Sequence, residues 1–218
     1  MAQKQFAVIG LGRFGSSVAK TLYELGYDVL GIDVDEELVQ DSVDIVTHAV
    51  ACDSTDENAL KSIGIRNFDV VVVAIGDDVR SSILTTLTLK EMGVKMIVVK
   101  AQDTMHGKVL EKIGADRVVY PERDMGARVA HNLISPNILD YIELADDYSI
   151  LEIQAPSKFV GRSLEQIDIR RKYGCNVMAI KHRTHINIAP IASDIIQEGD
   201  VLVVVGRNED LDELDETR

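Results

Sequence analysis

The stretch that decides the fold is "FAVIGLGRFGSSVAKTLYELGYDVLGIDVD", residues 6–35. It places a complete G-x-G-x-x-G between an apolar run and a segment with helical periodicity. Gly10 permits a tight turn, Gly12 lets the backbone approach a diphosphate, and Gly15 allows close packing of helix on strand. Asp33 ends the next apolar run, where a carboxylate accepts hydrogen bonds from both ribose hydroxyls and repels a 2′-phosphate. The pattern predicts a site for NAD or an adenosine phosphate.

Composition narrows the class of protein. The chain has 218 residues and a net charge of −13, which argues against a nucleic-acid partner. The longest apolar run, residues 70–75, is far shorter than the roughly 20 residues that span a bilayer. No secretory signal precedes the first apolar run, so we expect a cytoplasmic protein whose two cysteines, Cys52 and Cys175, are reduced.

Apolar β-branched runs alternate with helix-period segments up to about Leu133. The expected strands are 5–10, 28–33, 45–51, 70–75, 96–100 and 117–120. The expected helices are 14–25, 57–63, 81–92, 104–113 and 121–134. Glycine follows four of these helices, at the position where a helix end favours positive φ. This alternation predicts an α/β fold with a Rossmann-like, doubly wound parallel sheet over residues 1–133.

The pattern changes near Tyr148, where short strands are separated by turns and one helix, 163–172. We expect a crossover or linker over residues 134–147 and a second, smaller α+β domain over residues 148–218. The pair His182-x-x-His185 favours a surface hairpin turn over a metal site, because no further ligands accompany it. The acidic tail, 208–218, indicates a solvated helix end or a frayed terminus.

Three polar residues, Arg13, Asp53 and Glu122, have two interpretations each, and Lys100 has one. Arg13 suits terminal phosphate oxygens or is an exposed arginine at a helix start. Asp53 lines the adenine side of the crevice or caps the next helix. Lys100 and Glu122 follow strands at the carboxyl edge, although an acid in a first helical turn also complements the helix dipole. The other positions expected along the crevice are Leu11, Phe14, Val34, Asp35, Ser54, Ala74, Ile75 and Gly76.

The sequence offers no convincing catalytic constellation beside this cradle. It lacks G-x-S-x-G and H-E-x-x-H, and the glycine loop lacks the Lys-Ser/Thr of an NTPase P-loop. We therefore expect a nucleotide that is sensed rather than consumed, and no enzyme. The alternatives are a small NAD-dependent oxidoreductase and a free-standing NAD(H) sensor.

The residues resemble the RCK (KTN) family, in particular the KtrA/TrkA-type cytosolic regulatory subunits of bacterial potassium uptake systems. Strings that carry the resemblance include "FAVIGLGRFG", "ACDSTDENAL", "GIRNFDVVVVAIGDD" and "VLEKIGADRVVYPERDMG". The resemblance implies an RCK-N and an RCK-C domain, and homodimers that assemble into an octameric ring. It also implies docking on a membrane-embedded, KtrB/TrkH-like potassium-translocating subunit at the inner face of the cell membrane. ATP would activate transport and ADP would deactivate it; NAD(H) is also associated with the family.

The resemblance also implies roles for individual residues. Arg13 would face the γ-phosphate of its own or a dimer neighbour's nucleotide, and Asp33 would hold the ribose. Lys100 would line the phosphate side, and Glu122 would help to hold Mg²⁺, Ca²⁺ or Na⁺ near the phosphates. Cys52 departs from a commoner glycine before the aspartate of its turn.

Some KtrA-like subunits bind cyclic di-AMP at the dimer interface of their C-domains. Arg170, Asn176 and Pro190 lie in the matching region of this sequence, with Asn176 where a histidine can occur.

Overall fold

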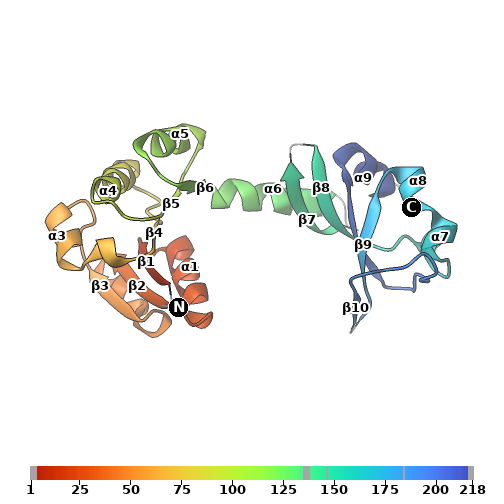
Figure 1. Ribbon diagram of the computed structural model, residues 1–218, viewed down its shortest axis with the longest axis horizontal. Helices are drawn as coiled ribbons and strands as arrows, with labels where there is room; N and C mark the ends of the chain where they lie inside the picture. Colours follow the sequence, from red (N-terminus) through yellow and green to blue (C-terminus); the bar gives the residue numbers. More distant parts are fainter. Residues whose placement is uncertain (1–3, 135–137, 146, 184, 216–218) are drawn as a thin grey trace. The chain divides into compact units, whose positions relative to one another are not determined.

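The computed structural model describes residues 4–134, 138–145, 147–183 and 185–215 (Figure 1). The chain forms two compact units, Met1–Glu122 and Arg123–Arg218. Their boundary falls inside helix α6 (Pro121–Ile134), earlier than the expected boundary at residue 133. Arg128 of α6 and Asp140, both in the second unit, form an ion pair at 2.7 Å. Within the described residues, no helix is long and apolar enough to cross a bilayer.

The first unit is a six-stranded parallel sheet in the order β3-β2-β1-β4-β5-β6, so the predicted doubly wound fold is confirmed. Its strands are β1 (Gln5–Ile9), β2 (Asp28–Asp33), β3 (His48–Ala51), β4 (Val70–Val73), β5 (Ile97–Lys100) and β6 (Arg117–Val119). Its helices are α1 (Arg13–Glu24), α2 (Glu36–Asp41), α3 (Glu57–Ser62), α4 (Val79–Glu91) and α5 (Thr104–Ile113). The strand order reverses between β1 and β4, where parallel sheets of this kind bind ligands.

Both faces of this sheet are covered, which explains why its strands are almost continuously apolar. On one face, Val8 packs with Ala19 of α1. On the other face, Ile9 packs with Leu60 of α3 and Leu110 of α5. Figure 1 shows α1 on one side of the sheet and α3, α4 and α5 on the other.

One local prediction in this unit was wrong, and one helix was not predicted. The strand expected over 45–51 begins only at His48, because Val43–Ile45 form a 3-10 helix whose Ile45 N–H donates to Ser42 O at 3.0 Å. Val46 still fills the core, from a turn rather than a strand. Helix α2 was not predicted, although Asp35 caps it by accepting the Glu37 N–H at 2.9 Å.

The second unit is an antiparallel sheet in the order β10-β9-β11-β8-β7. Its strands are β7 (Ile138–Ala145), β8 (Tyr148–Gln154), β9 (Asn176–Lys181), β10 (Ile186–Asn187) and β11 (Val201–Arg207). Its helices are α7 (Leu164–Ile167), α8 (Ile169–Tyr173) and α9 (Asn208–Asp215), with a 3-10 helix at Ser157–Phe159. Leu151 and Leu202 on the sheet pack with Ile167 of α7 and Leu211 of α9, so the helices cover one face.

Two predictions for this unit need correction. The linker expected over 134–147 is a strand from Ile138 to Ala145, because this segment pairs with β8 along most of its length. The single helix expected over 163–172 is two short helices, because Asp168 between them adopts φ 54°. The hairpin turn at His182 is confirmed, since its N–H donates to His185 O at 2.7 Å.

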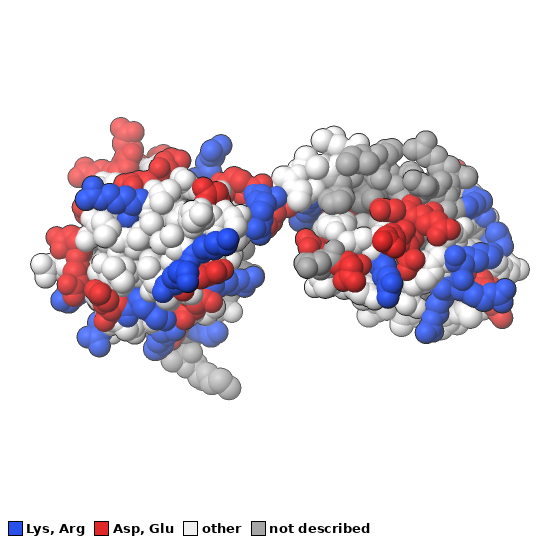
Figure 2. Space-filling view, turned by 90° about the horizontal axis from the view of Figure 1, so that it is seen from above, with Lys and Arg blue, Asp and Glu red and all other residues white. Residues whose placement is uncertain are grey.

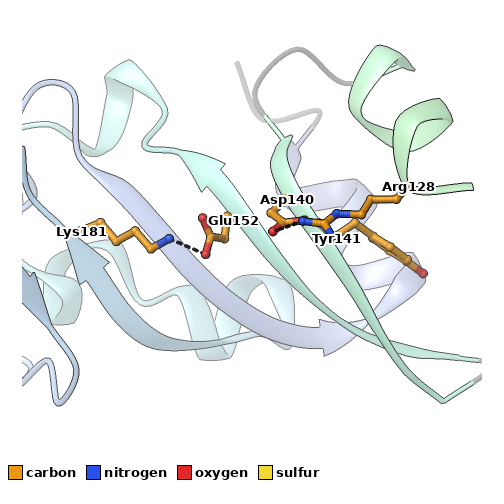
Figure 3. A network of polar contacts seen from close by, with 5 residues as sticks. All are labelled: Arg128, Asp140, Tyr141, Glu152 and Lys181. Carbon is orange, nitrogen blue, oxygen red and sulfur yellow. Dashed lines mark hydrogen bonds and ion pairs between the residues drawn. The ribbon is translucent and has the colours of Figure 1, made fainter. Parts of the chain in front are cut away.

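The sheet face opposite these helices carries a row of charges (Figure 3). Asp140 on β7 and Glu152 on β8 are direct cross-strand partners, and two like charges in that relation destabilise a sheet. Arg128 neutralises Asp140, and Lys181 reaches across β11 from β9 to Glu152. The two ion pairs therefore compensate a repulsion that the strand register creates.

Candidate functional site

The candidate site lies at the carboxyl edge of the first sheet, where the glycine loop joins β1 to α1. Gly10 adopts φ +93°, and its N–H donates to Ile32 O at 2.8 Å. A Cβ on Gly10 would lie 3.0 Å from Ala74 C and Ile75 N, so the segment after β4 forms a wall of the loop. A Cβ on Gly15 would lie 1.8 Å from Gly10 O. Both glycines are required by close backbone approaches.

Gly12 is different, because a Cβ built there would meet nothing within 4 Å. No side chain caps the start of α1, and no acidic residue lies in its first turn. Helices α2 to α5 each begin at an aspartate that accepts an amide N–H; these are Asp35, Asp56, Asp78 and Asp103. The start of α1 thus combines open space, uncapped amides and the positive end of a helix dipole, a combination that fits a phosphate.

Asp33 lies where the sequence places it, and its carboxylate also supports the loop. One oxygen accepts the Leu11 N–H at 2.6 Å, and the other accepts the Asp35 N–H at 3.0 Å. An ionised carboxylate has about four acceptor positions, so two remain for ribose hydroxyls. Leu11 itself is buried and lends only its backbone to the site, whereas Val34 is 73% exposed.

Two residues after β3 have structural roles. Asp53 does not cap α3, because Asp56 does so; Asp53 instead accepts hydrogen bonds from the Thr55 side chain and N–H. The bond from the Thr55 side chain is the main reason that the pKa of Asp53 is lowered. Ser54 is buried and hydrogen-bonded to Thr85 at 2.9 Å, which leaves it packed against α4 rather than open to a ligand.

Lys100 and Glu122 form an ion pair at the same edge of the sheet, between the end of β5 and the start of α6. Lys100 Nζ lies 2.6 Å from Glu122 Oε1 and 5.8 Å from the centroid of the Phe14 ring. A Cβ on Gly76 would lie 3.3 Å from the same Nζ. The hydrogen bond from Lys100 is the largest cause that lowers the pKa of Glu122, and the charge of the exposed Arg13 adds to it. Five residues that the sequence analysis singled out therefore lie together in the structure: Arg13, Phe14, Gly76, Lys100 and Glu122.

Gln102 is a neighbour that sequence reasoning missed. It follows β5, and its side-chain amide donates to the Gly76 carbonyl, which fixes the segment after β4. Its position just beyond a strand end, at the edge where ligands bind, was the available signal.

The described residues supply only part of the coordination that the predicted cation would need. Among the described residues, no three His, Cys, Asp or Glu side chains come together as a metal site. Glu122 is a single carboxylate already engaged by Lys100. Oxygen atoms of a bound phosphate would have to complete the coordination of a hard cation there.

In the second unit, Arg170 and Asn176 both line a hollow of about 370 Å³. Pro190 is not among the residues that line it. Cys175 lies on the same hollow, and burial raises the pKa of its thiol to about 11, so the thiol stays protonated and unreactive at neutral pH. His182 Nδ1 lies 2.7 Å from Asp200 Oδ1, which ties the predicted surface turn to the sheet.

Comparisons with known proteins agree with this architecture. The TrkA-N domain model matches residues 6–121, and the TrkA-C domain model matches residues 148–217. The chain is 52% identical to Ktr system potassium uptake protein C of Bacillus subtilis over 209 residues, 96% of this chain and 95% of the relative. It is 50% identical to Ktr system potassium uptake protein A of the same species over 208 residues, 95% and 94% of the two chains. The GsuK RCK domain structure matches at 25% identity with a TM-score of 0.55, covering 98% of this chain but 46% of that longer one.

Proposed function

This chain belongs to the RCK family of TrkA-N and TrkA-C domain proteins, and from that premise we propose that it is the nucleotide-sensing regulatory subunit of a Ktr-type potassium uptake system. The observation that carries the nucleotide part is the open, uncapped start of α1 at Gly12, next to Asp33. In this proposal Asp33 accepts from the ribose and the amides at the start of α1 bind the diphosphate. The protein responds to the nucleotide and does not transform it.

Adenosine phosphates are the proposed ligands, with ATP activating transport and ADP deactivating it. Support comes from the basic groups at the far end of the crevice, where Arg13 and Lys100 lie near Phe14 and Glu122. A guanidinium and an ammonium there favour a third phosphate over a nicotinamide. A hard cation such as Mg²⁺ or Ca²⁺ would be held by Glu122 together with phosphate oxygens and would offset their charge.

We also propose that the chain self-associates into dimers and a ring that docks on a potassium-translocating membrane subunit at the cytoplasmic face. Support for self-association comes from α6, whose Met125, Val129 and Leu133 recur every fourth residue and are 54%, 48% and 79% exposed. Side chains at this spacing share one helix face, so α6 presents an apolar stripe to solvent. Burial of such a stripe against a second copy removes apolar area from water.

A second ligand site is supported by the hollow at Arg170 and Asn176. The family resemblance makes cyclic di-AMP the candidate ligand. Arg170 provides the positive charge that a phosphodiester requires, and the apolar side chains of Ile169 and Val177 provide walls for a base.

Calorimetric titration with ATP, ADP, NADH and cyclic di-AMP, with particle size followed by light scattering, tests this proposal. Tighter binding of ATP and ADP than of NADH, together with nucleotide-dependent size, is the expected result. Tight NADH binding with no response to ATP would favour the free-standing NAD(H) sensor. Potassium flux into liposomes that hold the membrane subunit tests regulation: an ATP response that Mg²⁺ enhances equally in wild type and Glu122→Gln would contradict the role of Glu122.

On the face of the first unit seen in Figure 2, acidic and basic side chains are interspersed. A continuous basic surface, as required to contact a nucleic-acid backbone, is not seen on that face. A local, single-nucleotide site of the kind proposed needs only the few basic groups at the glycine loop.

A further inference from the structure

The two side chains of the Lys100–Glu122 ion pair differ strongly in their exposure to solvent. The Lys100 side chain is only 11% exposed, whereas that of Glu122 is 66% exposed. A largely buried ammonium is costly unless it keeps a partner, because burial removes the water that solvates it. In the described structure that partner is the Glu122 carboxylate, 2.6 Å away, and the Phe14 ring face lies close by.

The same ammonium is at the place where the proposed nucleotide would end. Phe14 lies in the first turn of α1, inside the glycine motif, and Gly76 follows β4, the neighbour of β1 at the point where the strand order reverses. Phosphates at this end would bring negative charge towards Glu122, and like charges disfavour one another. One ammonium cannot fully serve both the carboxylate and the phosphates.

We propose that Lys100 is a shared counter-ion, which binds Glu122 when no nucleotide is present and transfers to the phosphate oxygens when nucleotide binds. This inference rests on the proposed nucleotide site. Transfer leaves the Glu122 carboxylate without its lysine and available to a cation. Separation of the Lys100–Glu122 pair costs free energy and opposes nucleotide binding. Attraction between Lys100 and the phosphate oxygens offsets this cost, and it grows with each additional phosphate oxygen. Lys100 therefore favours ATP over ADP.

The exchange also links the site to α6. Glu122 is the second residue of α6 and the last residue of the first unit. The ion pair therefore ties the first turn of α6 to the end of β5, and transfer of Lys100 releases that tie. The ion pair that holds the first turn of α6 to β5 would thus depend on whether nucleotide is bound.

A double-mutant cycle tests the transfer. ATP and adenosine affinities are measured by calorimetry, in the presence of a chelator, for wild type, Lys100→Met, Glu122→Gln and the double variant. When Lys100 is present, Glu122→Gln should raise the affinity for ATP about tenfold. The variant removes two costs of binding: the repulsion between the Glu122 carboxylate and the phosphates, and the separation of the Lys100–Glu122 ion pair. In the Lys100→Met background the same change should tighten ATP only about twofold, because only repulsion remains. Adenosine affinity should be the same in all four proteins.

Lys95→Met is the matched control. Lys95 pairs with Asp69 at 2.7 Å in the same unit, just before β5, at the opposite edge of the sheet. Its removal should leave ATP affinity unchanged. Equal effects of Glu122→Gln in both backgrounds would overturn the transfer while leaving the nucleotide site intact. Failure of the wild type to bind either ATP or adenosine would overturn the proposed function as well.

Discussion

Replacement of Gly12 by alanine should weaken nucleotide binding at least about tenfold and leave the fold intact. Gly12 adopts φ −64° and ψ −174°, a conformation that alanine adopts without strain. The added Cβ would meet no atom of the protein within 4 Å. It would instead stand in the open space in front of the α1 amides, where the diphosphate is proposed to lie.

The magnitudes follow from this geometry. Alanine is a weaker helix N-cap than glycine, which costs up to about 1 kcal/mol, but it also restricts the unfolded chain, which contributes about 0.4–1 kcal/mol. The unfolding free energy should therefore change by less than about 1 kcal/mol. Loss of even one hydrogen bond from an amide to a charged phosphate costs about 1.5–3 kcal/mol, or about ten- to a hundredfold in affinity.

Gly15→Ala is the opposite case within the same motif. Its Cβ would lie 1.8 Å from Gly10 O and 3.0 Å from the Ala74 Cβ, and the first of these neighbours is backbone. The loop or the helix must move, and we expect the unfolding free energy to fall by about 3 kcal/mol or more.

Urea unfolding measures the stability of both variants, and calorimetry with ADP measures binding. The two variants should separate these quantities, because Gly12→Ala mainly weakens ADP binding and Gly15→Ala mainly lowers the unfolding free energy. Wild-type ADP affinity in Gly12→Ala would show that the diphosphate does not approach this loop. Wild-type stability in Gly15→Ala would refute the close contact between Gly15 of α1 and the Gly10 carbonyl.

Four further outcomes are expected. Asp33→Ala should weaken ATP, ADP and adenosine alike by calorimetry, because all three share the ribose; unchanged ATP binding would show that the crevice is assigned wrongly. Arg13→Ala should weaken ATP more than ADP, and equal losses would place its guanidinium away from the third phosphate. Burial lowers the pKa of His106 below its ordinary 6.5, so the unfolded chain binds more protons and the unfolding free energy should fall as the pH drops from about 7.5 to 5.5; urea unfolding of His106→Gln should show a flatter pH dependence. Lys181→Met should lower the unfolding free energy by about 1–2 kcal/mol, because Glu152 is left opposite another carboxylate, and Glu152→Gln added to it should restore part of that loss.

Much of the first unit could be predicted because its signals are local. Gly26, Gly64, Gly93 and Gly114 end their helices at positive φ, as their positions after helix-period segments indicated. Apolar runs located the buried strands for the same reason. The start of β3 was misplaced because an apolar side chain such as Val46 reaches the core from a turn as well as from a strand.

The second unit was harder, because its features depend on partners distant in sequence. β7 is a strand only because β8 and β11 extend the sheet beside it, and nothing in residues 138–145 alone distinguishes it from a linker. At the site, the sequence placed Lys100 and Glu122 at one edge but did not predict their ion pair. That contact depends on how the side chains cross the edge from β5 to α6, which strand order alone does not specify.

The contrast between α1 and the helices α2 to α5 bears on how the ligand contributes to folding. Four helices complete their first turn with an aspartate of their own chain, whereas α1 begins at Gly12 with its amides unbonded by any side chain. Glycine is a weaker cap than aspartate by only a few tenths of a kcal/mol, so the lack of a side-chain cap on α1 lowers the stability of the free protein only slightly. A phosphate that occupies the start of α1 acts as a removable cap, and the melting temperature of the first unit should rise with nucleotide concentration. An aspartate at position 12 would cap the helix permanently and exclude the proposed ligand, so the proposed response to nucleotide depends on a helix start that no side chain caps.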